Sequence, residues 1–211
     1  HWDDRRQRQM CIRDRANEGT IDYKDFISRI EVINACGYGV LVSNYFEYFK
    51  LASYLRRLIK MPIGLVMGLN NLADIFKQEY YSTLEGGILE AFGVLFKDNI
   101  RIYAYPVEEE TFERYRQQFR RGDNVNITES SNGLINVENL LVADNLRNLY
   151  KYVRENGFLE TIKECNRENM KFFSRDIFDQ IVQRKEGWKD NLPESVANMI
   201  ESKNLWSESN T

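Results

Sequence analysis

Short apolar runs that alternate with helical patterns constrain the fold of this chain more than any other feature. The first run is YGVLVS (38–43) and the second is IGLVMG (63–68). The third, IRIYAYPV (100–107), ends near Pro106. Runs of this length, bounded by glycine, proline or asparagine, are typical of strands buried on both faces of a parallel sheet. The pattern therefore predicts three parallel strands.

Amphipathic helices are predicted before and between these runs. Apolar residues recur at helical spacing within residues 26–33, 48–58 and 88–96, and LNNLADIF (69–76) follows the second run as a short helix. Helices that alternate with parallel strands form right-handed crossovers. We therefore expect an α/β fold, a truncated Rossmann-like parallel sheet of about three strands with flanking helices, followed by a small helical C-terminal region.

Changes in composition predict five regions along the chain. Residues 1–15 are expected to be a non-native, disordered N-terminal stretch, and residues 16–106 the α/β region. Residues 107–135 are highly charged and then polar, which indicates a linker or an insertion. Helical periodicity returns in residues 136–207, and residues 208–211 form a tail.

The basic stretch RRQRQMCIRDR (5–15) has two interpretations. A nucleic-acid-binding arm is usually joined to a module with a basic face, whereas residues 16–211 carry 24 basic and 29 acidic side chains, a net charge of −5. The wording of the stretch resembles translated sequencing-adapter read-through. We therefore expect an artefact rather than an arm, no nucleic-acid partner, and a chain that lacks its own N-terminal strands.

Composition also indicates whether the chain can form a core, hold a disulfide or a metal, or cross a membrane. A hydrophobic content of 43 % with 13 % aromatic residues is enough for a packed core in 211 residues. The three cysteines, Cys11, Cys36 and Cys165, are isolated and indicate neither a disulfide framework nor a zinc site. No apolar run reaches the roughly 18 residues that span a bilayer. We expect a cytoplasmic protein without a membrane partner or a bound metal.

The carboxyl ends of the predicted strands form the candidate binding site. Ligands of parallel sheets bind at these ends, beside helix N-termini. Ser43, Asn44, Gly68 and Asn70 lie there and would hold a nucleotide-like anion, unless they are only caps and turn residues. His1 is the single histidine, and the sequence has no G-x-G-x-x-G or GK[ST] motif. No catalytic residue is therefore predicted.

Three blocks resemble the C-terminal portion of a family of longer bacterial proteins. The blocks are GTIDYKDFISRIEVINACGYGVLVSNYFEYFKLASYLRRLIKMPIGLVMG, YYSTLEGGILEAFGVLFKDNIRIYAYP and LRNLYKYVRENGFLETI with FSRDIF. The family is catalogued as nicotinate-nucleotide adenylyltransferases, and sometimes as TonB-dependent receptors, a label that the helical periodicity does not fit. The resemblance implies nucleotidyl transfer from ATP to a pyridine mononucleotide in NAD biosynthesis.

The resemblance also implies where the chemistry would lie. Enzymes of this kind orient phosphates with an H-x-G-H-type motif, and that motif does not occur in these 211 residues. Its residues would therefore lie in a missing N-terminal portion of the same protein, the implied partner of this chain. Mg²⁺ would accompany ATP, and this chain itself would hold no cofactor.

Two alternatives remain open. The chain could be a non-catalytic Rossmann-like ligand-binding or scaffold protein. INACGYGVLVSN (33–44) also resembles the helix and strand before the second motif of haloacid-dehalogenase-like phosphatases, in which Ser43 would bind phosphate. That family needs a nucleophilic aspartate of D-x-D type, and none follows a predicted strand here.

Overall fold

Among the residues that the structure describes, two compact units form, one within residues 45–171 and one that joins residues 23–44 to residues 172–206. The computed structural model describes residues 23–45, 47–119, 125–127, 132–172 and 174–206. The predicted regions 1–15 and 208–211 lie outside the described residues. The two units are presented separately.

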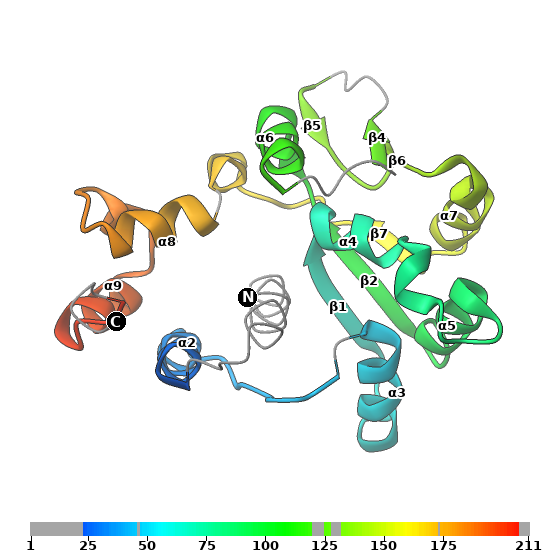
Figure 1. Cartoon of the computed structure of the whole chain (residues 1–211), viewed down its shortest axis with the longest axis horizontal. Coiled ribbons are helices and arrows are strands. Elements are labelled where there is room, and N and C mark those ends of the chain that lie inside the picture. Colours follow the sequence, from blue (N-terminus) through cyan, green and yellow to red (C-terminus); the bar gives the residue numbers. More distant parts are fainter. Residues whose placement is uncertain (1–22, 46, 120–124, 128–131, 173, 207–211) are drawn as a thin grey trace. The chain divides into compact units, whose positions relative to one another are not determined.

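The α/β unit, residues 45–171, is built on a three-stranded parallel sheet. Strand β1 (Ile63–Gly68) pairs with β2 (Ile100–Tyr105), and β2 pairs with β7 (Leu159–Thr161), so that the order is β1-β2-β7 (Figure 1). The predicted α/β class with a parallel sheet of three strands is confirmed.

The membership of the sheet differs from the prediction. Residues 38–43 form no regular element, and Tyr38, Leu41 and Val42 are 53 %, 47 % and 59 % exposed. A strand forms only where a neighbouring backbone satisfies its N–H and C=O groups, and no described strand pairs with this segment. The predicted strand is therefore wrong, and β7 takes the third place because it pairs with β2.

Helices of the α/β unit cover one face of the sheet. They are α3 (Tyr48–Leu58), α4 (Leu69–Ile75), η1 (Gln78–Tyr81), α5 (Gly87–Leu95), η2 (Asp144–Leu146) and α7 (Arg147–Glu155), while η3 (Arg167–Lys171) contacts β3. Buried side chains of α3, α4, α5 and α7 form a single core with the strands. Phe92 lies at its centre, with edge-to-face ring contacts to Phe76 and Phe96.

The opposite face of the sheet is open in the described structure. Along β1, Leu65 and Met67 are buried, whereas Gly64 and Val66 are exposed. The same alternation continues along β2, where Tyr105 is 36 % exposed. Parallel sheets are ordinarily covered on both faces. The expectation that these strands are buried on both faces is therefore wrong for the part of the chain that the structure describes.

The described residues between 107 and 142 belong to the α/β unit. Helix α6 (Glu109–Phe119) follows β3 (Val107–Glu108), which pairs antiparallel with β5 (Leu134–Ile135), and β4 (Val125–Ile127) pairs antiparallel with β6 (Leu140–Val142). Phe112 and Ile135 are at most 1 % exposed and belong to the main core. The region predicted as a linker or an insertion thus contributes buried apolar side chains to the main core.

The second unit is helical and joins segments from both ends of the sequence. It contains α2 (Tyr23–Ala35), α8 (Ser174–Val182), η4 (Trp188–Asn191) and α9 (Glu194–Ser202). Ile181, Val196 and Ile200 form its core. The predicted helical C-terminal region is therefore present, but it packs with α2, which had been assigned to the α/β region.

Asp25 connects the two ends of the helical unit. Its carboxylate accepts hydrogen bonds from Arg29 Nε at 2.6 and 2.7 Å and from Trp206 Nε1 at 2.7 Å. The Arg29 guanidinium also lies over the ring of Phe178, 5.0 Å from its centroid. These contacts join α2 to α8 and to the end of α9, which sequence periodicity alone does not reveal.

The one-sided burial of β1 predicts that truncations of two neighbouring residues destabilise the α/β unit to very different extents. Met67→Ala should lower the free energy of unfolding of the α/β unit by about 3 kcal/mol, because a fully buried side chain leaves a cavity. Val66→Ala, the matched control on the open face, should cost less than about 1 kcal/mol. Native-state amide exchange in β2 measures both values, and equal losses would contradict the one-sided sheet.

Candidate functional site

Two of the four predicted site residues lie at a strand end. Gly68 is the last residue of β1 and the N-cap of α4, and it is buried, while Asn70 is half-buried in the first turn of α4. Ser43 and Asn44 belong to the helical unit and follow no strand. Their predicted place at a strand end is therefore wrong, because residues 38–43 form no strand in the described structure.

The sequence analysis missed a buried polar group on α4, the helix that follows Gly68. Asn71 and Asp74 occupy the same side of α4 and are 1 % and 2 % exposed. Lys77 places its Nζ 2.7 Å from Asp74 Oδ1, and its side chain is 18 % exposed. The second carboxylate oxygen, Oδ2, has no hydrogen-bond partner among the described residues. A buried carboxylate with its own cation therefore lies in the last turn of α4, the helix that follows β1.

The composition of α4 explains this burial. Leu69, Leu72, Ala73 and Ile75 are all buried, so this seven-residue helix presents almost no side to solvent. A charged side chain on such a helix enters the protein interior whichever way it points. Desolvation of a lone carboxylate costs several kcal/mol, and the ammonium of Lys77 offsets this cost.

A turn closes the carboxyl end of β7. Thr161, the last residue of β7, accepts a hydrogen bond from Val137 N at 3.2 Å and donates one to Glu138 Oε2 at 2.7 Å. Tyr150 of α7 donates to the Val137 carbonyl at 2.6 Å, and its burial raises the pKa of the phenol. Val137 itself is fully buried. The carboxyl end of β1 therefore remains as the candidate site of the sheet.

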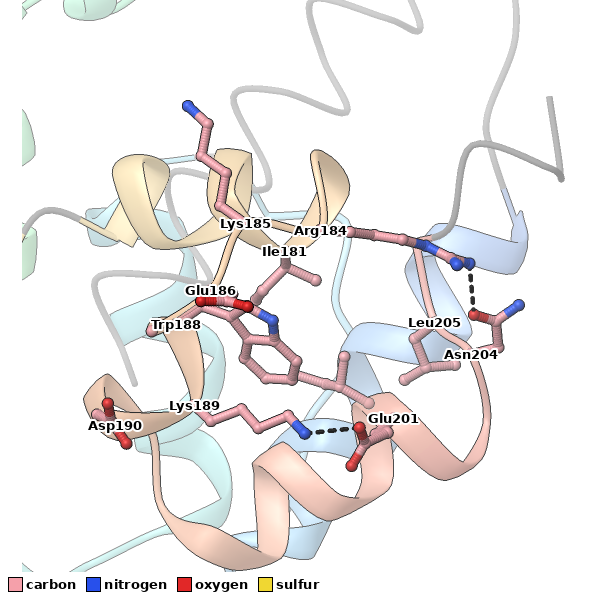
Figure 2. A pocket seen from close by; sticks show the side chains of 12 residues that line it. Ile181, Arg184, Lys185, Glu186, Trp188, Lys189, Asp190, Glu201, Asn204 and Leu205 are labelled. Carbon is pink, nitrogen blue, oxygen red and sulfur yellow. Dashed lines mark hydrogen bonds and ion pairs between the residues drawn. The ribbon is translucent and has the colours of Figure 1, made fainter.

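A separate pocket lies within the helical unit, between the end of α8, η4 and the end of α9 (Figure 2). Its volume is about 500 Å³. Ile181, Ile200 and Leu205 supply apolar side chains, and the Trp188 indole lies across the middle of the group. Arg184 and Asn204 line this pocket and follow α8 and α9 with φ angles of 51° and 49°.

The charges around this pocket balance. Its lining contains the cations Arg184, Lys185 and Lys189 and the acids Glu186, Asp190 and Glu201. Lys189 pairs with Glu201 at 2.6 Å, and Arg184 donates to Asn204 Oδ1 at 3.0 Å (Figure 2). The lining therefore favours neither an anionic nor a cationic ligand, and the sheet edge remains the stronger candidate.

The described thiols are poor nucleophiles. Burial raises the pKa of Cys36 and of Cys165, which lowers the fraction of reactive thiolate at neutral pH. Within the described part of the chain, no three His, Cys, Asp or Glu side chains gather closely enough to hold a metal ion. None of the helices described there is long and apolar enough to cross a membrane.

Comparisons with known proteins do not add to this geometry. No family model matches the chain, and neither a curated protein nor a solved structure matches it.

The buried ion pair gives the first prediction for this site. Lys77→Met keeps the aliphatic stem but leaves the Asp74 carboxylate without its cation, and should lower the free energy of unfolding by about 3 kcal/mol. Adding Asp74→Asn should recover most of that loss, as chemical denaturation of the two variants would measure.

A solvent-exposed pair supplies the control. Lys151 and Glu155 lie 3.8 Å apart with side chains 63 % and 57 % exposed, and Lys151→Met should cost less than about 1 kcal/mol. If Lys77→Met and Lys151→Met lower the free energy of unfolding equally, the stability of the fold does not depend on the cation that pairs with the buried Asp74 carboxylate.

The turn at the end of β7 gives the second prediction. Tyr150→Phe removes the donor to the buried Val137 carbonyl and should cost about 1 to 3 kcal/mol at neutral pH. Amide exchange in residues 137–142 should become faster. Phe158→Leu, a change of a partly buried side chain in the same core that donates no hydrogen bond, should leave exchange of this turn unchanged.

The raised pKa of Tyr150 also predicts how its contribution to the free energy of unfolding changes with pH. The unfolded phenol ionises near its ordinary value of 10.0, whereas the folded one stays protonated to higher pH. The contribution of Tyr150 is therefore complete below about pH 10 and is lost as the pH rises above it. Between pH 9 and pH 11, the free energy of unfolding should fall less for Tyr150→Phe than for the unchanged protein, as chemical denaturation at the two pH values would measure.

Proposed function

We propose that the chain is the C-terminal, non-catalytic part of a cytoplasmic α/β protein that transfers a nucleotidyl group from ATP to a pyridine mononucleotide. The three sequence blocks that resemble nicotinate-nucleotide adenylyltransferases support the reaction class. In this proposal the phosphate-handling residues, and the Mg²⁺ that accompanies ATP, belong to the N-terminal portion of the same protein. This chain supplies the sheet against which that portion assembles.

One observation carries the proposal. Within the described residues of the α/β unit, the sheet is parallel and covered by helices on one face, and its strands follow one another from β1 to β7 in a single direction. This arrangement corresponds to half of a doubly wound sheet. In such sheets a nucleotide binds outside the carboxyl ends of the strands, at the point where the strand order reverses. That point would lie beside β1, where the chain places Gly68 and Asn70.

A scaffold without catalysis is the second candidate. The Asp74 carboxylate is already paired with Lys77, and a turn already occupies the end of β7, which favours a structural role for these polar groups. The phosphatase alternative requires Ser43 at a strand end, and Ser43 follows no strand in the described structure. We therefore do not propose it.

Thermal unfolding of this chain tests where the phosphate contacts lie. Millimolar ATP with Mg²⁺ should shift the melting temperature by less than about 1 °C. A ligand at a hundred times its dissociation constant would instead add about 2.7 kcal/mol and raise the melting temperature by several degrees. A clear upward shift would place phosphate contacts in this chain and contradict the assignment.

Dinucleotide synthesis by the complete protein tests the reaction itself. With Mg²⁺, ATP and nicotinate mononucleotide, the folded protein should form a pyridine dinucleotide and release pyrophosphate. Heat-denatured protein is the control. A folded protein that forms no product above that control would leave the scaffold role as the remaining proposal.

A further inference from the structure

We propose that Asn132 is a site of spontaneous covalent modification, at which the side-chain amide is lost as ammonia and the residue becomes aspartate or isoaspartate. The sequence contains two Asn-Gly pairs, Asn132-Gly133 and Asn156-Gly157. Asparagine reacts most readily where glycine follows it, because glycine has no Cβ to hinder attack by its own nitrogen. The proposal goes beyond the proposed function, since the reaction needs only water and does not depend on nucleotide transfer.

The reaction joins two neighbouring groups of the chain. The Gly133 nitrogen loses its proton and attacks Asn132 Cγ, so that a new C–N bond forms while the bond from Cγ to Nδ2 breaks and ammonia leaves with the proton. Water then opens the resulting succinimide ring. Cleavage at the side-chain carbonyl gives aspartate, whereas cleavage at the main-chain carbonyl gives isoaspartate, in which the main chain continues through Cγ. No group is oxidised or reduced.

The turn before β5 keeps the reacting groups available. The Leu134 N–H donates a hydrogen bond to Asn132 Oδ1 at 3.1 Å, which folds the Asn132 side chain over the main chain that contains the Gly133 nitrogen. This bond also withdraws electrons from Cγ, which makes it a better electrophile. Gly133 has a φ of 70°, and its N–H donates no hydrogen bond to any residue that the structure describes. The attacking nitrogen is therefore not held by a competing acceptor.

The other pair, Asn156-Gly157, is held in an unreactive geometry at the end of α7. Asn156 Nδ2 donates to the Tyr152 carbonyl at 2.8 Å, and the Gly157 N–H donates to the Arg154 carbonyl at 3.1 Å. The ψ of Asn156 is 8°, which places the Gly157 nitrogen beside the Asn156 backbone nitrogen instead of beside its Cβ. Ring closure requires rotation about this bond and loss of the helix cap. The modification is therefore assigned to Asn132 and not to Asn156.

The aspartyl product places a negative charge beside a cation. Arg167 of η3 donates from Nη2 to the Asn132 main-chain carbonyl at 3.1 Å, and its Nε lies 3.9 Å from Glu108 Oε1. An aspartate at position 132 is ionised at neutral pH. Its carboxylate keeps the oxygen that accepts the Leu134 N–H and gains the nearby Arg167 guanidinium as a counter-ion. The aspartyl form should therefore preserve the turn.

The isoaspartyl product should instead weaken the pairing of β3 with β5. It adds one carbon to the main chain before Gly133, whose carbonyl accepts the Glu109 N–H at 3.0 Å. The described parts of β3 and β5 pair through two residues each, so a shift at the start of β5 affects the whole ladder. Amide exchange at Glu109 should therefore become faster in the isoaspartyl form.

Peptide mass spectrometry of the full chain, incubated at neutral pH, tests the assignment. In the folded chain Asn132 should change from amide to carboxyl at least about tenfold faster than Asn156, because two hydrogen bonds must open at Asn156. In urea the two sites should react at comparable rates, since each is then an unrestrained Asn-Gly pair. The rate at Asn132 should rise with pH, as attack by a deprotonated nitrogen requires.

Three variants separate the effects of the two products and of the two sites. Asn132→Gln should stop the modification at this position, because the longer side chain cannot close a five-membered ring. Asn156→Gln, the matched control, should leave the rate at Asn132 unchanged. Asn132→Asp should leave exchange at Glu109 unchanged, whereas isolated isoaspartyl protein should show faster exchange there. Circular dichroism checks that all three variants are folded.

Three results would overturn the proposal. Equal rates at Asn132 and Asn156 in the folded chain would show that the local geometry does not select between them. A rate at Asn132 that is much slower in the folded chain than in urea would show that the turn protects this residue. Formation of aspartate without isoaspartate would identify direct hydrolysis in place of the succinimide. None of these readouts involves nucleotide, so failure here is distinguishable from failure of the proposed function.

Discussion

The hydrogen-bonding demand of a parallel strand is the constraint on which this structure depends. β1 contributes Leu65 and Met67 to the main core and pairs with β2 along its whole length. Pairing with β2 satisfies the backbone groups along one edge of β1, and the core packing buries one of its two faces. The other edge and the other face remain open in the described structure, and this asymmetry distinguishes the α/β unit from a complete doubly wound sheet.

The sequence allowed β1 and β2 to be predicted because each is an apolar run of strand length between helical patterns. The run at residues 38–43 has the same composition, yet it is not a strand, since pairing depends on a neighbouring backbone that composition does not encode. β7 is the opposite case. Its three residues, which include Glu160, are not an apolar run that would predict a strand, yet they form one because they pair with β2. Periodicity likewise predicts α2 but not its packing against α9.

The candidate site was predicted only in part for a related reason. Gly68 and Asn70 follow a recognisable strand, so their position at its end could be inferred. Asp74 gave a weaker signal: it stands in a short helix that is apolar on nearly every side, three residues before Lys77. That context indicates burial, and the spacing indicates the ion pair. The turn at Val137 carried no signal, since Thr161 and Tyr150 meet it only after the chain has folded.

The closed and open parts of the sheet together determine where function can lie. The turn at Val137 occupies the end of β7, and helices cover one face, so new contacts are possible mainly along the outer edge of β1. In the proposed complete protein, a strand of the N-terminal portion at this edge would bring a second carboxyl end beside Gly68. A crevice between two strand ends is the geometry in which parallel sheets bind nucleotides. Completion of the sheet and formation of a ligand site would therefore be the same event.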